Sequence, residues 1–549
     1  MPLQKNQVLT LRVERLSSDG SGVAHSPDGE TVFVPGAAPG DEARVRIVKD
    51  CKRYAFGILD EVLTPSPDRI PVDCAVAGPC GGCSLRHLDY AAELRAKQEN
   101  VADAFAHIGG LDVPVLPIVG SPEVNRYRNK VQFPVGVDKS GKPCIGFYAG
   151  RTHRIVPCPD CRLQPGVLNE IGNALCAFFA EKGIQPYSEE TGKGLVRHIF
   201  LRRGAHSGQI MVCLVCTCAK LPCAEELCTR LKAQFAEITT ILLNVNAKNT
   251  NVILGTETHT LYGPGYIEDT LCGVPVQLGP LSFYQVNTLA AEQLYGIAAQ
   301  YAQLTPDDLL LDLYCGMGTI GLSMAAHCRE LIGVEIVPEA IESAKANAAR
   351  MGTDVAAKSR FFCADAGQAA TRLAAEGLHP DIVMLDPPRK GCDEATLSAV
   401  VRMAPRRVVY VSCNPATAAR DAAWLEQNGY HTEKVQPVDL FPRTRHCECV
   451  IALSKGEIDS KKVRVEFSLE GMDTSGLQKG ATYPEIKTRV LEQTGLKVSS
   501  LYISQVKQKC GLEVRENHHK AKSENTKQPQ CPKEKEDAIV DALRHFQMI

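Results

Sequence analysis

The spacing of apolar residues changes character along the chain. Between residues 6 and 63, short β-rich stretches such as TVFVPG (31–36) are separated by Gly, Pro and Asp turns. This spacing is typical of a small all-β module. Between residues 309 and 453, apolar runs alternate with amphipathic stretches of helical length. The second pattern predicts a parallel sheet with crossover helices.

The stretch between these two regions contains both helical and strand patterns. Residues 91–108 predict a helix, because apolar residues recur on one face. Residues 125–270 alternate strands and turns, with helical segments near 165–182 and 221–236. We therefore expect an α+β arrangement for the middle of the chain.

The composition shifts after residue 455. SKGEIDSKK (454–462) predicts a linker, and a closing helix is expected at the C-terminus. Between them the sequence predicts two helices separated near Gly495, with Ser499 or Ser500 capping the second. The chain is thus expected to have four parts: a β-barrel (1–63), an α+β central domain (64–270), an α/β domain with a mostly parallel sheet (271–455), and a linker with a helical extension of unknown role (456–549).

Composition narrows the functional classes only slightly. A formal net charge of -2 over 549 residues favours no particular partner, so any nucleic-acid surface must arise from local clustering. No apolar run has membrane-spanning length, and MPLQKNQVLT lacks the apolar core of a signal peptide. We therefore expect a cytoplasmic protein without a membrane partner, and a monomer. In that compartment 23 cysteines do not indicate a disulfide framework.

A glycine turn opens the third region. LLLDLYCGMGTIGL (309–322) is an apolar strand followed by a turn, in which Gly316 and Gly318 permit close contact with a ligand, and by a helix. The next strand ends at Glu335, where a carboxylate can accept hydrogen bonds from ribose hydroxyls. The alternative is a glycine turn that serves only helix packing.

Two further strands carry an acid at their carboxyl ends, where ligands of open parallel sheets bind. FFCAD ends at Asp365, and DIVMLDPPRKG places Asp386 before Pro387 and Pro388. Spacing alone does not separate a nicotinamide cofactor from S-adenosylmethionine. The rigid Asp-Pro-Pro segment favours a methyltransferase that acts on a planar base.

The stretch VVYVSCNPAT (408–417) delivers a thiol, Cys413, at the end of another apolar strand. A thiolate is a soft nucleophile that can add to carbon 6 of uracil and thereby activate carbon 5 for methylation. A base must then remove the carbon 5 proton, and Glu448 in RTRHCECV (443–450) is the candidate. Without the surrounding motifs, the alternative is structural: Cys413 would be a buried thiol, and Glu448 would be a surface acid on an edge strand.

A cysteine cluster occurs earlier in the chain. Cys74, Cys80 and Cys83 are closely spaced, and either Cys158 or Cys161 can supply a fourth thiolate. Four thiolates suit a 4Fe-4S cluster or zinc, and spacing does not decide between them. The alternative is a chance group of free thiols.

Together, FYQVN (283–287), LDLYCGMGTIGL, LDPPRKG, SCNP and RTRHCECV resemble the RNA uracil-5-methyltransferase family, specifically its 23S ribosomal RNA branch. The resemblance covers about residues 6–453. It implies a class I methyltransferase domain, an N-terminal TRAM domain, S-adenosyl-L-methionine and a 4Fe-4S cluster as cofactors, and 23S rRNA as substrate. By the same resemblance, the nucleophile is Cys413, the proton acceptor Glu448, the cofactor contacts Gln285, Tyr314, Glu335, Asp365 and Asp386, and the cluster ligands Cys74, Cys80, Cys83 and Cys161.

One position departs from the family pattern, because Thr319 stands where some members have Asn after the glycine turn. RYRNKVQFP (126–134) resembles the family's RNA-facing segment, and KDCKRYAFG (49–57) interleaves cations with aromatics that can stack on bases. For the latter, a solvated strand edge is the alternative. Two rival functions remain: a tRNA uracil-5-methyltransferase, and a non-catalytic or redox-sensing RNA-binding protein built on the iron-sulfur module.

Overall fold

The computed structural model describes residues 3–150, 152–248, 251–456, 483–494, 496, 498–510 and 531–546. It divides into two compact units, Met1–Asp459 and Ser460–Ile549. Most of the predicted linker and the predicted turn residue Gly495 lie outside the described residues. No helix in the described parts of the chain is both long and apolar enough to cross a membrane.

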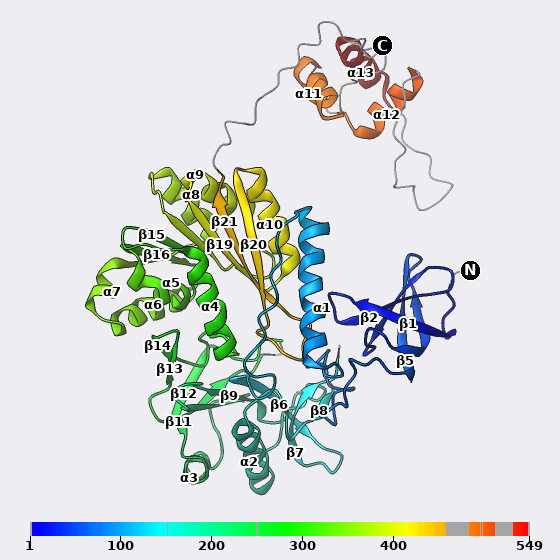
Figure 1. Cartoon of the computed structure of the whole chain (residues 1–549). Coiled ribbons are helices and arrows are strands. Elements are labelled where there is room, and N and C mark those ends of the chain that lie inside the picture. The colour runs from blue at the N-terminus through cyan, green and yellow to red at the C-terminus, as the bar shows by residue number, and fades with distance from the viewer. Residues whose placement is uncertain are drawn as a thin grey trace. The chain divides into compact units, whose positions relative to one another are not determined.

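The N-terminal strands close into a five-stranded barrel (Figure 1), as the sequence predicted. Alternate residues, among them Leu11, Val13 and Val45, point into its core, because successive side chains of a strand face opposite sides. The barrel order is β1-β2-β3-β5-β4. The strands are β1 (Val8–Leu16), β2 (Ser21–His25), β3 (Thr31–Pro35), β4 (Glu42–Asp50) and β5 (Tyr54–Thr64).

A helix connects the barrel to the rest of the first unit. Helix α1 (Tyr90–Asp103) begins where the Asp89 carboxylate accepts a hydrogen bond from the Ala92 amide, and it continues as the π-helical turn η1 (Ala104–Gly109). The buried Lys97 ammonium contacts carboxylates of Glu93 (2.7 Å) and Asp439 (2.8 Å). This ion pair fastens α1 to a segment more than 300 residues later in the chain.

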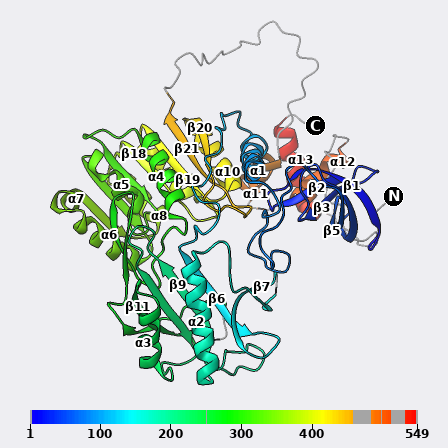
Figure 2. The ribbon, with the colours of Figure 1, turned by 60° about the horizontal axis from the view of Figure 1, so that its bottom comes forward.

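The central region contains a seven-stranded sheet in the order β12-β11-β10-β9-β6-β7-β8. Helices α2 (Gly166–Lys182) and α3 (Ala224–Gln234) pack on it through leucine, isoleucine and phenylalanine side chains, and both are visible in Figure 2. Its strands are β6 (Lys130–Val137), β7 (Pro143–Tyr148), β8 (Ile155–Pro157), β9 (Val196–Arg203), β10 (Ile210–Cys216), β11 (Ile238–Val245) and β12 (Glu257–Tyr262).

A hairpin, β13 (Ile267–Leu271) and β14 (Val274–Leu278), and helix α4 (Thr288–Ala302) lead into the third sheet. That sheet has the order β17-β16-β15-β18-β19-β21-β20. Its first five strands are parallel, as expected, and β21 runs antiparallel to both of its neighbours. The strands are β15 (Leu309–Leu313), β16 (Glu330–Glu335), β17 (Ser359–Cys363), β18 (Ile382–Leu385), β19 (Arg407–Ser412), β20 (Tyr430–Val438) and β21 (Glu448–Lys455).

The direction of β21 matters for the site. Parallel strands bring their carboxyl ends to one edge of the sheet, whereas an antiparallel strand begins at that edge. Ser412, at the end of β19, pairs with Cys449, the second residue of β21. Between the strands lie α5 (Thr319–Met324), α6 (Pro338–Arg350), α7 (Thr353–Lys358), α8 (Ala366–Ala375), α9 (Glu394–Met403) and α10 (Pro415–Gln427).

In the second unit the described residues form α11 (Tyr483–Thr494), α12 (Ser500–Lys509) and α13 (Lys533–His545). The Ser499 side chain caps α12 by accepting a hydrogen bond from the Tyr502 amide. A small apolar core joins the three helices, with Ile486, Val490, Ile503, Ile539 and Leu543 fully buried.

Candidate active site

The glycine turn after β15 has three residues in the left-handed backbone region. Gly316 (φ +54°) and Gly318 (φ +79°) adopt it freely, whereas Tyr314 (φ +66°) carries a side chain there. A non-glycine residue in this region is strained and often marks a functional segment. The Tyr314 hydroxyl lies 3.3 Å from the Thr396 hydroxyl, which holds the ring on the side of α9.

The carboxylate of Glu335 closes the same turn. It accepts hydrogen bonds from the backbone amides of Gly316 (3.1 Å) and Val337 (3.0 Å). The predicted ribose acid therefore joins the end of β16 to the glycine turn, at the edge that the topology rule indicated.

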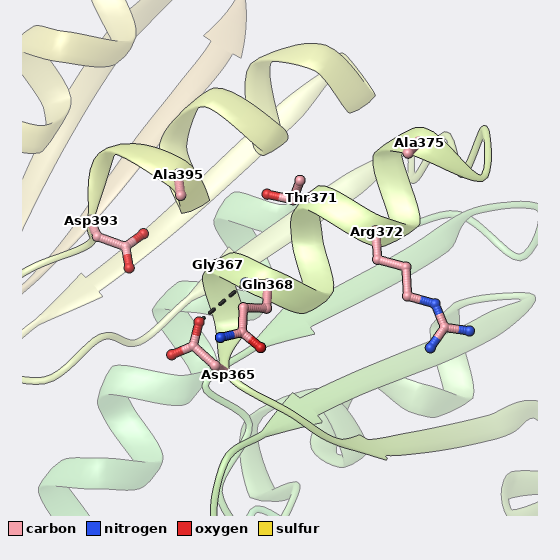
Figure 3. A pocket seen from close by; sticks show the side chains of 8 residues that line it. All are labelled: Asp365, Gly367, Gln368, Thr371, Arg372, Ala375, Asp393 and Ala395. Carbon is pink, nitrogen blue, oxygen red and sulfur yellow. Dashed lines mark hydrogen bonds between the residues drawn. The ribbon is translucent and has the colours of Figure 1, made fainter.

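Asp365 occupies the next position along this edge. It caps α8 by accepting a hydrogen bond from the Gln368 amide (3.1 Å). It also lines a hollow of about 580 Å³ that runs along α8, with Asp393 at the start of α9 on the opposite wall (Figure 3). None of the other predicted site residues lines this hollow.

Three acidic or thiol groups meet where β18, β19 and β21 come together. Asp386 follows β18, Cys413 follows β19, and Glu448 is the first residue of β21. Enclosure raises the pKa of Asp386 to about 7, although part of the residue stays exposed. Burial and the charge of Asp386 raise the pKa of Glu448 to about 8. Burial and the Glu448 charge also raise the pKa of the Cys413 thiol.

A cation faces this group from the Asp-Pro-Pro-Arg segment. Arg389 lowers the pKa of both Cys413 and Glu448 and so opposes the effect of burial. Its Nη2 lies 3.1 Å from Nδ1 of His446, whose pKa falls to about 4 through burial and the charge of Arg389. A neutral His446 ring accepts this hydrogen bond. Neither residue is among those predicted from the sequence, although each stands within three positions of a predicted one.

The loop that presents Cys413 is held by its neighbours. The Asn414 side chain caps α10 at the Ala416 amide and donates a hydrogen bond to the Arg389 carbonyl (2.9 Å). The Asn414 amide donates to the Ser412 hydroxyl (3.1 Å). The chain therefore leaves the sheet directly at Cys413 and enters a helix with Pro415 in its first turn.

Gln285 lies in the segment between β14 and α4. Its side chain contacts the buried Tyr295, whose hydroxyl is 3.3 Å from that of Thr319. The charge of Asp386 contributes to the raised pKa of Tyr295, so Gln285, Thr319 and Asp386 all lie around one phenol ring. Asp312, inside β15, is another acid close to Asp386, and burial and the charge of Asp386 raise its pKa to about 8. An acid within the apolar run LLLDL was a signal the sequence reading did not use.

The predicted cluster ligands share a cavity in another part of the first unit. A cavity of about 270 Å³ is lined by Cys74, Cys80, Cys83, Cys158 and Cys161. Throughout the described ranges, no three His, Cys, Asp or Glu side chains are grouped so as to hold a metal ion. A hydrogen bond from the Cys158 thiol lowers the pKa of Cys161 to about 7. Four cations also line the cavity: Arg86, Arg128, Lys130 and Arg162.

The two predicted RNA-facing segments differ in exposure. Tyr127 is buried and donates a hydrogen bond to the Pro442 carbonyl, and Arg126 donates to the Cys161 carbonyl (2.8 Å). These two side chains therefore hold the protein together. On the barrel, by contrast, Tyr54 is 40% exposed and its ring packs against Phe33 and Phe56.

Comparisons with known proteins agree with this architecture. The family model for tRNA (Uracil-5-)-methyltransferase matches residues 276–456, and the TRAM domain model matches residues 2–59. An uncharacterized RNA methyltransferase of Halalkalibacterium halodurans is 43% identical over 453 residues, which are 82% of this chain and 98% of that protein. The chain belongs to the RNA uracil-5-methyltransferase family.

Other relatives of this RNA methyltransferase span the same length. One from Clostridium tetani is 41% identical over 83% of this chain and 98% of its own. Among solved structures, the Pyrococcus abyssi tRNA (uracil-54, C5)-methyltransferase in complex with S-adenosyl-L-homocysteine superposes with a TM-score of 0.65. It is 26% identical and covers 81% of this chain and 100% of that one.

Proposed function

We propose that this RNA methyltransferase transfers a methyl group from S-adenosyl-L-methionine to carbon 5 of a uridine in 23S rRNA. The observation that carries the proposal is the meeting of Cys413, Glu448 and Asp386 at the edge that bears the glycine turn. A nucleophilic thiol beside a buried carboxyl group suits attack on a base followed by proton removal.

The residues at this edge fit a cationic cofactor. Asp312 and Asp386 are enclosed acids with raised pKa values, and Oδ1 of Asp312 is buried without a hydrogen-bond partner among the described residues. S-Adenosylmethionine supplies an electrophilic methyl group on a positively charged sulfur. In the proposal it is held by Gln285, Tyr314, Glu335, Asp365 and Asp386. The Pyrococcus abyssi structure, which contains S-adenosyl-L-homocysteine, supports the choice of cofactor.

The roles of the two reacting side chains follow from their chemistry. The Cys413 thiolate forms a bond to carbon 6 of uracil, which places the electron pair of the ring double bond on carbon 5. After carbon 5 has gained the methyl group, the Glu448 carboxylate accepts the proton from that carbon. The carbon–sulfur bond then breaks, which restores the ring double bond and the thiolate.

Arg389 assists both groups in this scheme. Its charge favours the ionised forms of Cys413 and Glu448, which are the forms that attack carbon 6 and accept the proton. Burial works against both ionisations, and the guanidinium offsets part of the resulting rise in the two pKa values.

The experiment uses the different steps assigned to the two residues. Glu448→Gln, incubated with substrate RNA and S-adenosylmethionine, is expected to accumulate a covalent RNA–protein band on a denaturing gel. Cys413→Ala and the double variant are expected to give none. A strong covalent band from Cys413→Ala would overturn the assignment of the nucleophile.

We further propose that Cys74, Cys80, Cys83 and Cys161 hold a 4Fe-4S cluster. All four line one cavity, and the surrounding cations offset the charge of a cluster with four thiolates.

Metal analysis tests this assignment. Protein purified without air is expected to contain about four irons per chain. Cys161→Ala is expected to lose the iron, and Cys158→Ala, its matched control from the same cavity, is expected to retain it. Stoichiometric zinc without iron would contradict the proposal.

The RNA substrate is tested separately. The barrel aromatics Phe33, Tyr54 and Phe56 lie together beside Lys52 and Arg53, a combination suited to stacked bases and phosphates. With methyl-labelled cofactor, transfer to ribosomal RNA transcripts is expected. Transfer to tRNA transcripts alone would favour the second candidate function, a tRNA uracil-5-methyltransferase. The Pyrococcus abyssi enzyme carries that activity in its name.

A further inference from the structure

Arg202 is a fully buried arginine in β9, far from the reacting groups in sequence. Among the described residues, no carboxylate forms an ion pair with it, and burial lowers the pKa of its guanidinium to about 10. Burying a charged group without an opposite charge is unfavourable unless its hydrogen-bonding groups are well used. The polar contacts of the Arg202 side chain must therefore offset the cost of burying its charge.

The guanidinium fork of Arg202 holds one turn of the chain. Its Nη1 donates to the Gly279 carbonyl and its Nη2 to the Ser282 carbonyl, each at 2.7 Å. The Gly279 amide in turn donates to the Ser282 hydroxyl (3.0 Å), so the turn is closed on itself. It directly precedes Phe283 and Gln285.

Asn129, on the neighbouring chain segment, holds the other end. Its Nδ2 donates to the Gln285 carbonyl (2.8 Å) and to the Thr288 hydroxyl (2.9 Å), and its amide donates to the Val286 carbonyl (2.8 Å). Residues 279–287 form neither helix nor strand, so these contacts with the central sheet replace the backbone bonds that a regular element would supply.

We propose that Arg202 and Asn129 are positioning residues that hold the 279–288 segment in its cofactor-binding conformation, so that the central sheet sets the affinity for S-adenosylmethionine. The inference rests on the proposed function, because it assigns Gln285 to the cofactor. Lysine cannot replace Arg202 in this role, since one ammonium does not reproduce a planar fork that reaches two carbonyls.

The test measures binding of S-adenosyl-L-homocysteine to the full chain by calorimetry. Arg202→Lys is expected to weaken binding about tenfold, as the loss of one charge-assisted hydrogen bond implies. The KM for S-adenosylmethionine is expected to rise by a similar factor, with a smaller change in kcat. Arg203→Lys makes the same exchange one residue later, outside the 279–282 turn, and is expected to leave the affinity unchanged.

A purely structural role would lower the unfolding temperature without this KM change, so thermal unfolding is recorded for every variant. Asn129→Ala gives an independent reading if Arg202→Lys does not fold, and it is also expected to weaken binding. Unchanged affinity in a folded variant of either residue overturns the inference alone. If the unaltered protein binds no S-adenosyl-L-homocysteine, the proposed function fails, and the inference fails with it.

Discussion

At the scale of single residues, the candidate site is defined by acids that stay partly protonated near neutral pH. Burial raises the pKa values of Asp312, Asp386 and Glu448, and the charge of Asp386 raises those of Asp312 and Glu448 further. Such environments are common where a carboxyl group must accept a proton during catalysis. At Glu448, the charge of Arg389 lowers the pKa and so opposes the effect of burial.

The raised pKa of Glu448 predicts the pH dependence of methyl transfer. A proton acceptor acts only when ionised, so the rate is expected to rise as pH increases through about 8. The raised pKa of Cys413 acts in the same direction, because only the thiolate attacks. Arg389→Met is expected to move the profile to higher pH. Single-turnover rates at saturating RNA and cofactor test this, and a flat profile through pH 8 would contradict it.

At the scale of elements, the turn between β15 and α5 combines two glycines with different surroundings. A Cβ on Gly318 would lie 3.1 Å from Leu322 Cδ1 and 3.2 Å from Ala344 Cβ. A Cβ on Gly316 would meet no atom within 4 Å. Gly316 therefore faces open space at the proposed cofactor edge, whereas Gly318 lies against α6.

These surroundings predict that the two alanine variants differ in how much stability and how much cofactor affinity they lose. Gly318→Ala is expected to reduce the free energy of unfolding by about 2 kcal/mol, through backbone strain and a tight contact. Gly316→Ala is expected to lose about 1 kcal/mol from strain alone, yet to weaken S-adenosyl-L-homocysteine binding more strongly. Denaturant unfolding and calorimetry separate the two effects. Equal loss of binding in both variants would argue against cofactor contact at Gly316.

At the scale of the whole molecule, the chain has two units with separate cores. Among the described residues, the core of the second unit consists of side chains between Ile486 and Phe546. The site residues, the cysteine cavity and the barrel all belong to the first unit. Each unit thus has an apolar core that is built from its own described residues.

This division predicts the behaviour of a chain that ends at Asp459. It is expected to fold, to bind S-adenosyl-L-homocysteine with the affinity of the full chain, and to keep its unfolding temperature. The physical reason is that every core residue of the first unit is retained. Calorimetry and thermal unfolding of the truncated and full chains provide the comparison. A truncated chain that aggregates or binds no ligand would contradict the division.

The sequence by itself determined the local helices and strands. It also determined much of the sheet edge at which the carboxyl ends of the parallel strands meet. The apolar run before Cys413, the glycine turn at Gly316 and the acid at Asp386 are local patterns, and the rule for parallel strands predicts that their ends meet. The closed barrel follows the predicted β-rich stretches in the same way. Local periodicity is enough here because each element buries one face.

Only the tertiary structure decided which distant residues meet. Glu448 lies beside Cys413 because β21 runs antiparallel to β19, and nothing in the residues of β21 states that direction. Tyr127, in the segment that resembles an RNA-facing one, is buried against Pro442, and Arg202 is buried against the turn before Gln285. Strand pairing and burial depend on contacts between residues far apart in the chain, and local spacing of apolar residues does not encode those contacts.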